Sequence, residues 1–212
     1  AVEEHAIPRQ ALFVDFQEML QRTRPECVIV ATTAPTHCRY TCQAAKAGVG
    51  YILCEKPMGV SLAECDLMLE TCRRYGARLA VNHQMRFMEQ YLAAQDLIKS
   101  KEFGGLTGIT VIAGNFGMAM NGTHYFELFR WLTGEVPAEV SAWLSPDPVP
   151  SPRGPEFDDR AGAVRLTAPS GKRFYMDVGA DQGHGIKVVY SGRSGQLVTD
   201  ELAGEIRVSL RM

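Results

Sequence analysis

The sequence predicts an α/β fold, in which a parallel sheet with helices on its faces is followed by an α+β domain with a mostly antiparallel open sheet. Two observations predict the first part. Short, continuous apolar runs occur at 27–31, 51–54 and 78–81, and such runs are typical of strands buried on both faces. Helical segments separate these runs, and strand–helix–strand connections of this spacing produce right-handed crossovers between parallel strands.

Start and stop signals define the helices of this first part. A capping box, in which a short polar residue is followed three positions later by Glu, occurs at Asp15 with Glu18 and at Ser61 with Glu64. Glycines that suit the left-handed position after a helix follow at 48 and 76. These signals predict helices over about 16–23, 36–47 and 61–75.

The pattern changes after residue 84, where we place a boundary between domains covering 1–84 and 85–212. The second domain is predicted to contain helices over about 86–100 and 123–133 and a strand over about 106–113. From Val136 onward we expect alternating strands, with a hairpin at 168–172. Five prolines between 146 and 155 predict an irregular loop there.

Composition excludes several classes of function. The 212 residues are 46% hydrophobic and carry 22 basic against 24 acidic side chains, a net charge of -2. No basic field exists to hold a polyanion, so nucleic acid is not an expected partner. No apolar run approaches a membrane span, and the first ten residues lack a signal-peptide pattern. We therefore expect a cytoplasmic protein.

Six cysteines lie between positions 27 and 72 without any C-x-x-C spacing. Cys38 and Cys42 are four residues apart in a predicted helix, where thiols commonly act as small apolar fillers. We expect reduced, structural cysteines and no metal site, and the less favoured alternative is zinc binding.

Polar side chains follow each of the three predicted parallel strands, at 32–37, 55–57 and 82–84. Ligands of open parallel sheets bind beyond the carboxyl ends of the strands. Lys56 is the first catalytic candidate, because it lies on a short loop between Glu55 and Pro57, whose φ is restricted. An exposed turn with an adjacent charge pair explains the same residues, so both readings stay open.

His124 is the second candidate. It follows Thr123, a suitable N-cap, so we expect its imidazole in the first turn of a helix. There the helix dipole would lower the pKa of the ring and favour a neutral base that accepts a proton. A capping or surface histidine is the alternative.

Taken together, the motifs resemble the Gfo/Idh/MocA family of NAD(P)-dependent oxidoreductases. The match follows the order P-x-H (35–37), A-x-x-A-G-V (44–49), YILCEKP (51–57), N-x-x-x-R-F (82–87) and GTHYFELFRWLTGE (122–135). The resemblance implies a partial Rossmann-type parallel sheet, NAD or NADP as cofactor, and a sugar, cyclic polyol or related hydroxy compound as substrate. It also implies a homo-oligomer formed through the open sheet of the second domain.

The resemblance assigns residues to roles. Lys56 and His124 are the expected catalytic residues, with His124 as the acid/base. The expected substrate-binding residues are Asn82, Arg86 and Asn121. The expected cofactor-binding residues are Thr32, Thr33, Pro35, His37, Glu55 and Lys56.

The sequence departs from the family pattern in two places. Many members have an acidic residue four positions before the histidine, where this chain has Met120. The glycine-rich turn of the dinucleotide site is absent, since no G-x-G-x-x-G occurs. We therefore expect a chain truncated at its N-terminus and at its C-terminus. A non-catalytic module for ligand binding or self-association is the alternative.

Overall fold

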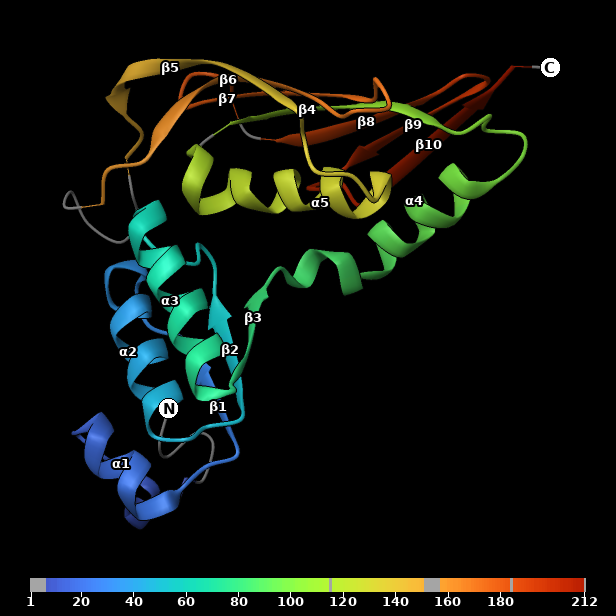
Figure 1. Ribbon diagram of the computed structural model, residues 1–212. Coiled ribbons are helices and arrows are strands. Elements are labelled where there is room, and N and C mark those ends of the chain that lie inside the picture. Colours follow the sequence, from blue (N-terminus) through green and yellow to red (C-terminus); the bar gives the residue numbers. More distant parts are fainter. Residues whose placement is uncertain (1–6, 115, 151–156, 184, 212) are drawn as a thin grey trace. The chain divides into compact units, whose positions relative to one another are not determined.

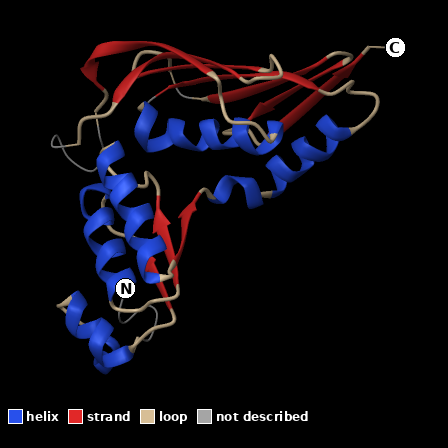
Figure 2. Cartoon of the chain, viewed as in Figure 1, coloured by secondary structure: helices blue, strands red, loops and turns tan. Residues whose placement is uncertain are grey.

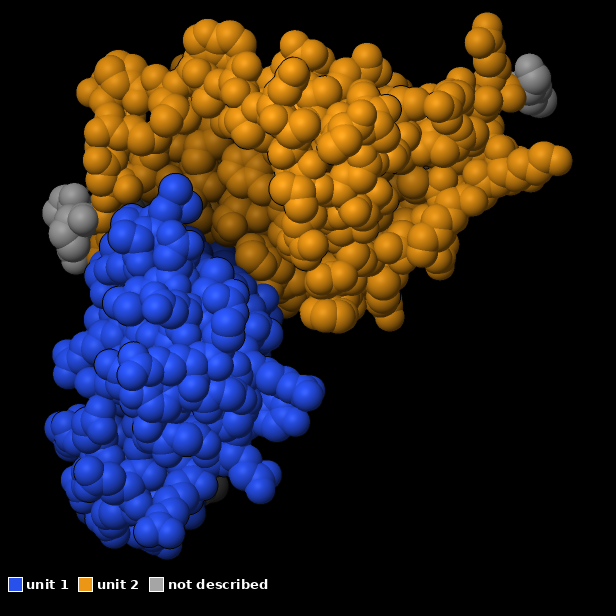
Figure 3. Space-filling view, viewed as in Figure 1, with its two compact units in different colours: residues 1–82 blue, residues 83–212 orange. Residues whose placement is uncertain are grey.

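The computed structural model describes residues 7–114, 116–150, 157–183 and 185–211. The chain divides into two compact units, Ala1–Asn82 and His83–Met212, which Figure 3 distinguishes by colour. Each unit has its own hydrophobic core, so each is described separately.

The first unit contains a three-stranded parallel sheet with the order β1-β2-β3. Helices α2 and α3 pack side by side against it (Figure 1), as the sequence predicts for this part of the chain. The elements are α1 (Phe16–Thr23), β1 (Cys27–Val30), α2 (Ala34–Lys46), β2 (Tyr51–Glu55), α3 (Leu62–Tyr75) and β3 (Arg78–Asn82).

Local caps determine where these helices begin. The Asp15 carboxylate accepts the Glu18 backbone N–H at 2.7 Å, and the Ser61 hydroxyl oxygen accepts the Glu64 N–H at 3.2 Å. The N-cap hydrogen bond of each predicted capping box is therefore confirmed. Helix α2 begins at Ala34, two residues earlier than expected, because Pro35 is tolerated in a first turn, where its missing N–H needs no partner.

Four cysteines belong to the core of the first unit: Cys38, Cys42, Cys54 and Cys72. They are buried among aliphatic side chains, as the spacing predicts for apolar fillers. Burial raises the pKa of the Cys38 and Cys54 thiols to about 11. These thiols are consequently protonated at neutral pH and poorly nucleophilic. Within the described ranges, no group of three or more His, Cys, Asp or Glu side chains is arranged to hold a metal ion.

The second unit is built on a seven-stranded sheet with the order β10-β9-β8-β4-β7-β6-β5. Its neighbouring strands are antiparallel except for the parallel pair β4 and β7, which confirms the predicted sheet type. The strands are β4 (Leu106–Gly114), β5 (Glu139–Pro148), β6 (Arg160–Thr167), β7 (Arg173–Gly179), β8 (Ile186–Gly192), β9 (Gly195–Asp200) and β10 (Glu205–Leu210).

Helices α4 (Glu89–Lys99) and α5 (Thr123–Thr133) cover one face of this sheet and leave the other uncovered (Figures 1 and 2). The core lies between helices and sheet, where Phe129 and Phe174 pack with their ring centroids 5.7 Å apart. The hairpin at 168–172 is confirmed by a hydrogen bond from Ala168 N–H to the Lys172 carbonyl at 2.9 Å. In the described part of the chain, no helix is long and apolar enough to cross a membrane.

Two local predictions for the second unit are wrong. The expected helix over 86–100 is interrupted at Met88, which has an extended backbone between the 3-10 turn Gln84–Phe87 and α4. The turn before Met88 contains Arg86, which pairs with a glutamate on α5. A local sequence pattern does not reveal such a tertiary contact. Strand β5 also continues through the predicted loop as far as Pro148, because an edge strand tolerates prolines. Residues 151–156 of that loop lie outside the described residues.

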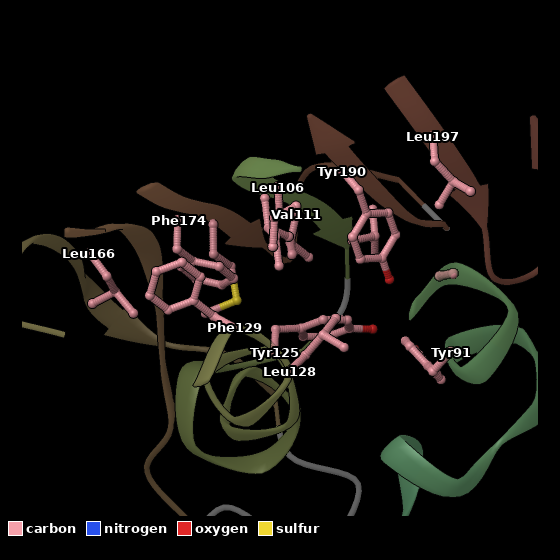
Figure 4. Packing of buried hydrophobic residues seen from close by; sticks show 14 of the residues in the cluster. Tyr91, Leu106, Val111, Tyr125, Leu128, Phe129, Leu166, Phe174, Tyr190 and Leu197 are labelled. Carbon is pink, nitrogen blue, oxygen red and sulfur yellow. The ribbon is translucent and has the colours of Figure 1, made fainter. Parts of the chain in front are cut away.

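A half-buried carboxylate links three elements of the second unit. Tyr125 of α5 donates a hydrogen bond to Glu201 Oε2 at 2.8 Å, and Tyr91 of α4 donates to Glu201 Oε1. Glu201 follows β9, and the buried ring of Tyr190 from β8 lies in the same cluster; Figure 4 shows the three tyrosines converging. Burial raises the pKa of Glu201, and the two tyrosine hydroxyls partly oppose this shift.

Replacing Tyr125 with Phe should lower the free energy of unfolding of the second unit by about 2 kcal/mol, the range for a hydrogen bond to a charged group. Both tryptophans of the chain, Trp131 and Trp143, lie in this unit, so denaturant titration followed by tryptophan fluorescence reports its unfolding. Tyr175→Phe is the matched control, because the Tyr175 side chain is 42% exposed. Equal losses in the two variants would contradict the assignment.

The Glu201 cluster also predicts a pH dependence. Because folding raises the pKa of Glu201 above its ordinary value of 4.5, this group stabilises the fold below about that pH. The contribution is lost as the pH rises through the folded-state pKa. The stability of the wild type relative to Glu201→Gln, which does not titrate, should therefore fall as the pH rises above 4.5. Parallel curves for the two proteins would refute the prediction.

Candidate functional site

The carboxyl ends of the three parallel strands meet at one edge of the first unit. Glu55 at the end of β2 is the register partner of Asn82 at the end of β3. The Asn82 side-chain amide donates a hydrogen bond to Glu55 Oε1 at 2.6 Å. The sheet thus brings together two of the residues that the sequence singles out, and it pairs them with each other.

The loop after β1 presents hydroxyl groups at the same edge. Thr32 and Thr33 are exposed, and Thr33 occupies the N-cap position of α2 without a capping side-chain hydrogen bond. Thr36 Oγ1 lies 2.7 Å from Thr32 Oγ1 and 2.8 Å from the Thr33 carbonyl oxygen. Pro35 is exposed in the first helical turn. The hydroxyls of this loop are therefore available to a ligand beyond the strand ends.

His37 joins this loop to the loop after β2. Its side chain is 1% exposed, with Nδ1 2.8 Å from the Pro57 carbonyl oxygen and Nε2 3.0 Å from the Thr32 carbonyl oxygen. A neutral ring donates to one of these carbonyls, and a protonated ring donates to both. Both ring nitrogens thus contact backbone carbonyls, and His37 connects the two loops; its expected contact with a cofactor stays a prediction.

Lys56 lies in the loop that His37 anchors. It is half-buried and follows Glu55, which is held by Asn82. The peptide bond between Lys56 and Pro57 is cis, and the Pro57 carbonyl contacts His37. Hydrogen bonds on either side thus hold the backbone that carries Lys56, which favours the reading of a positioned lysine over that of an exposed turn.

In the second unit, His124 lies beside a second histidine. The His124 side chain is 6% exposed, and its ring centroid lies 5.7 Å from that of His83, with the ring planes nearly perpendicular. His83 Nε2 lies 3.2 Å from Thr123 Oγ1, the residue before His124. Sequence reasoning did not select His83, and its position directly after Asn82 at a strand end is the signal that would have done so.

The local surroundings of His124 differ from the prediction. Thr123 is not an N-cap, since a π-helical turn, Met118–Gly122, runs directly into α5. The helical path therefore begins five residues before α5, and the dipole argument for a first-turn histidine does not apply. Asn121 and Met120 belong to this turn, and both are half-buried.

The Asp159 side chain caps the first residues of the π-helical turn. Its two carboxylate oxygens accept the backbone N–H groups of Ala119 and Met120, each at 2.8 Å. Sequence reasoning missed this residue because its partners lie 39 and 40 positions away. No local spacing signals such a contact.

Arg86 is already engaged by side chains of α5. Its guanidinium contacts Glu127 at 3.2 Å and lies 5.6 Å from the centroid of the Trp131 ring. Glu127 also pairs with Arg130 at 2.7 Å. The structure thus gives Arg86 a packing role within the second unit, beside the substrate-binding role that the sequence suggests.

A parallel strand and helix arrangement with polar groups at the carboxyl ends of its strands is typical of nucleotide-binding α/β domains. Residues 2–83 match the model of the Gfo/Idh/MocA oxidoreductase family, described as an NAD-binding Rossmann fold. Nearly the whole of the first unit therefore matches this family, as the motifs predict.

Curated relatives agree with this assignment. The chain is 27% identical over 133 residues to the rhizopine catabolism protein MocA of Rhizobium meliloti, covering 57% of the chain and 42% of that protein. It is 29% identical over 143 residues to D-apiose dehydrogenase of Paraburkholderia graminis (60% and 38%). It is 26% identical over 105 residues to inositol 2-dehydrogenase of Salmonella typhimurium (49% and 31%). The aligned parts span less than half of each of these relatives.

Solved structures share the fold over nearly the whole chain. A crystal structure of aldose-aldose oxidoreductase from Caulobacter crescentus, complexed with glycerol, superposes with a TM-score of 0.81 at 24% identity. The match covers 99% of this chain and 68% of that one. The fold of the second unit is therefore also that of a known oxidoreductase structure.

Replacing His37 with Ala should destabilise the first unit by about 2 to 4 kcal/mol, because it leaves a cavity and two carbonyls without their partner. Hydrogen exchange measured by mass spectrometry on peptides from 27–60 checks this locally. Lys46→Ala is the control, since Lys46 is exposed on the same helix. Unchanged protection in His37→Ala would show that the imidazole does not anchor the loops.

Proposed function

We propose that the protein is an NAD(P)-dependent oxidoreductase acting on a sugar, a cyclic polyol or a related hydroxy compound. In this proposal the first unit binds the dinucleotide and the second binds the substrate. The observation that carries the proposal is the anchored loop of Lys56 at the strand ends of a domain that matches an NAD-binding Rossmann model. The dehydrogenase names of two relatives, for D-apiose and inositol, support the substrate class.

The residues at the strand ends fit the nicotinamide half of such a cofactor. Thr32 and Thr33 are exposed. Glu55 ends the adjacent strand β2, and Lys56 follows it. Pro35 lies in the first turn of α2, where it could contact the cofactor. These five residues would hold the cofactor, and His37 would set the separation of their two loops.

The chemistry follows from a lysine and an imidazole. A nicotinamide cofactor, when bound, would supply the acceptor for a hydride from the substrate carbon. Oxidation of an alcohol also requires loss of the hydroxyl proton, which we assign to His124 as general base. The Lys56 ammonium stabilises the negative charge that develops on the substrate oxygen. In the reverse direction, His124 returns the proton.

Asn121 is the substrate-binding residue that this proposal favours most. It lies in the turn directly before His124 and offers both a donor and an acceptor to a hydroxyl group. Asn82 and Arg86 are held by Glu55 and Glu127, so any contact with substrate must be shared with those carboxylates.

A non-catalytic module is the second candidate. It is favoured by Met120, which supplies no carboxylate near His124, and by the absence of G-x-G-x-x-G. In this alternative, the chain binds a ligand or associates with itself without turnover.

We also propose that the protein forms a homo-oligomer through the uncovered face of the second unit. The register of the strands places Trp143 of β5, Tyr175 of β7 and Ile112 of β4 on the same face of the sheet. Their side chains are 69%, 42% and 52% exposed, respectively. Exposed aromatic and aliphatic groups on one sheet face are typical of a protein interface.

Lys56→Met should lower kcat about 100- to 1000-fold, the cost of removing a group that stabilises an oxyanion. His124→Asn should lower kcat about 100- to 10,000-fold through loss of the base. Formation of reduced nicotinamide, followed by absorbance with inositol and aldose substrates, measures both effects. Lys46→Met is the matched control, because Lys46 is an exposed lysine of the same unit.

Calorimetric titration with NADH and NADPH separates the two candidate functions. Cofactor binding together with turnover supports the oxidoreductase. Full activity in Lys56→Met would overturn the catalytic assignment, and absence of both cofactor binding and turnover in the wild type would favour the non-catalytic module.

A further inference from the structure

We infer that Asp159 is a positioning residue for the segment that carries Asn121 and His124. The inference rests on the proposed function, because it concerns the same site. Asp159 stands at the start of β6, far in sequence from the turn that it contacts. It would not touch the substrate, the cofactor or the reacting atoms.

The first step is the geometry of the contact. Each carboxylate oxygen of Asp159 accepts one backbone N–H, from Ala119 and from Met120, at 2.8 Å. These N–H groups lie in the first turn of the helical path, where regular helices leave donors without intrahelical partners. The Asp159 side chain is 8% exposed, and hydrogen bonds to a buried carboxylate are among the stronger ones. The contact therefore fixes both the position and the orientation of the turn.

The second step concerns the shape of the turn itself. Gly122 N–H and Asn121 N–H both point to the Gly117 carbonyl oxygen, at 3.3 and 3.4 Å. The bond from Gly122 spans five residues, which is the π-helical pattern and is rarer than the α-helical one. A turn of this kind needs support from outside its own backbone, and Asp159 supplies it.

The third step concerns space around the turn. A side chain at Gly117 would clash with the Asp159 carboxylate, because an added Cβ would lie only 2.3 Å from Asp159 Cγ. An added Cβ at Gly122 would lie 2.9 Å from Met176 Cε. Glycine at 117 thus permits the close approach of the carboxylate, and the turn is packed tightly at both of its ends.

The fourth step is the rigidity of the support. The Asp159 carbonyl oxygen accepts the Val149 backbone N–H at 2.9 Å, which ties Asp159 to the segment after β5. Arg160, the next residue, begins β6 and pairs with Pro148. A carboxylate directly before a strand, with its own backbone hydrogen-bonded, can hold the turn more accurately than one on an isolated loop.

The consequence concerns the proposed chemistry. Asn121 and the backbone leading to His124 belong to the turn that Asp159 holds, and a misplacement of about 1 Å in a catalytic group can lower a rate about 100-fold. Loss of Asp159 should therefore lower kcat, while cofactor affinity, which we assign to the first unit, stays unchanged.

The test uses Asp159→Ala, Asp159→Asn and Gly117→Ala, with Asp158→Ala as the matched control. Asp158 is the adjacent carboxylate; its side chain is 59% exposed and pairs with Arg160. Hydrogen exchange of the Ala119 and Met120 amides by NMR reports the contact directly. Tryptophan fluorescence reports the fold of each variant. Assays of kcat, KM and NADH affinity report function.

We expect Asp159→Ala to raise exchange at Ala119 and Met120 about tenfold or more, and to lower kcat about 100-fold with NADH affinity within about twofold of the wild type. Asp159→Asn keeps one acceptor oxygen and should fall in between. Gly117→Ala should reproduce the loss of kcat although the carboxylate is retained, and Asp158→Ala should match the wild type.

Two results would overturn the inference. One is unchanged exchange at both amides in a folded Asp159→Ala variant. The other is an equal loss of kcat in Asp158→Ala and Asp159→Ala. If the wild type turns over no sugar or polyol, the proposed function fails, and the exchange data still decide whether Asp159 holds the turn.

Discussion

Buried polar groups need hydrogen-bond partners, and this constraint governs how the loops and helix starts of both units are held. Loss of a partner for a buried group costs more free energy than a typical surface contact provides. Two buried side chains and a half-buried one meet the need by reaching to other elements. His37 contacts two loop carbonyls, Asp159 accepts two backbone N–H groups, and the half-buried Glu201 accepts two tyrosine hydroxyls. The apolar cores supply most of the burial, but these side chains specify where the irregular segments lie.

The constraint connects the fold to the proposed chemistry. Lys56 and the segment before His124 both lie in irregular structure, where a backbone without support would sample several positions. His37 and Asn82 hold the flanks of Lys56, and Asp159 holds the turn before His124. In each unit, therefore, a side chain that is shielded from solvent positions a second side chain, and we propose that this second side chain acts on the substrate. The same logic separates the residues of the sequence motifs into those that would bind ligands and those, such as His37 and Arg86, that hold the protein together.

Much of the fold was predictable from local patterns. The capping boxes at Asp15 and Ser61 located two helices, and the apolar runs located the three parallel strands. Errors arose where a distant contact or a strand position overrides local preference. Prolines 146 and 148 lie in a strand because that strand is at the edge of its sheet. Thr123 is not a cap because the helical path already begins at the π-helical turn before it, where Asp159 accepts a backbone N–H.

For the candidate site, the sequence by itself determined which chemical groups lie at the strand ends: the hydroxyls after β1, the Glu-Lys-Pro segment and the asparagine that ends β3. These assignments depend on residues close together along the chain, whose periodicity and caps are local. Only the tertiary structure decided how these groups are engaged. It buried His37, paired Asn82 with Glu55, placed His83 beside His124 and brought Asp159 to the turn before α5. The physical reason is distance along the chain, because most of these partners are separated by 20 to 41 residues, and no local spacing encodes a contact of that kind.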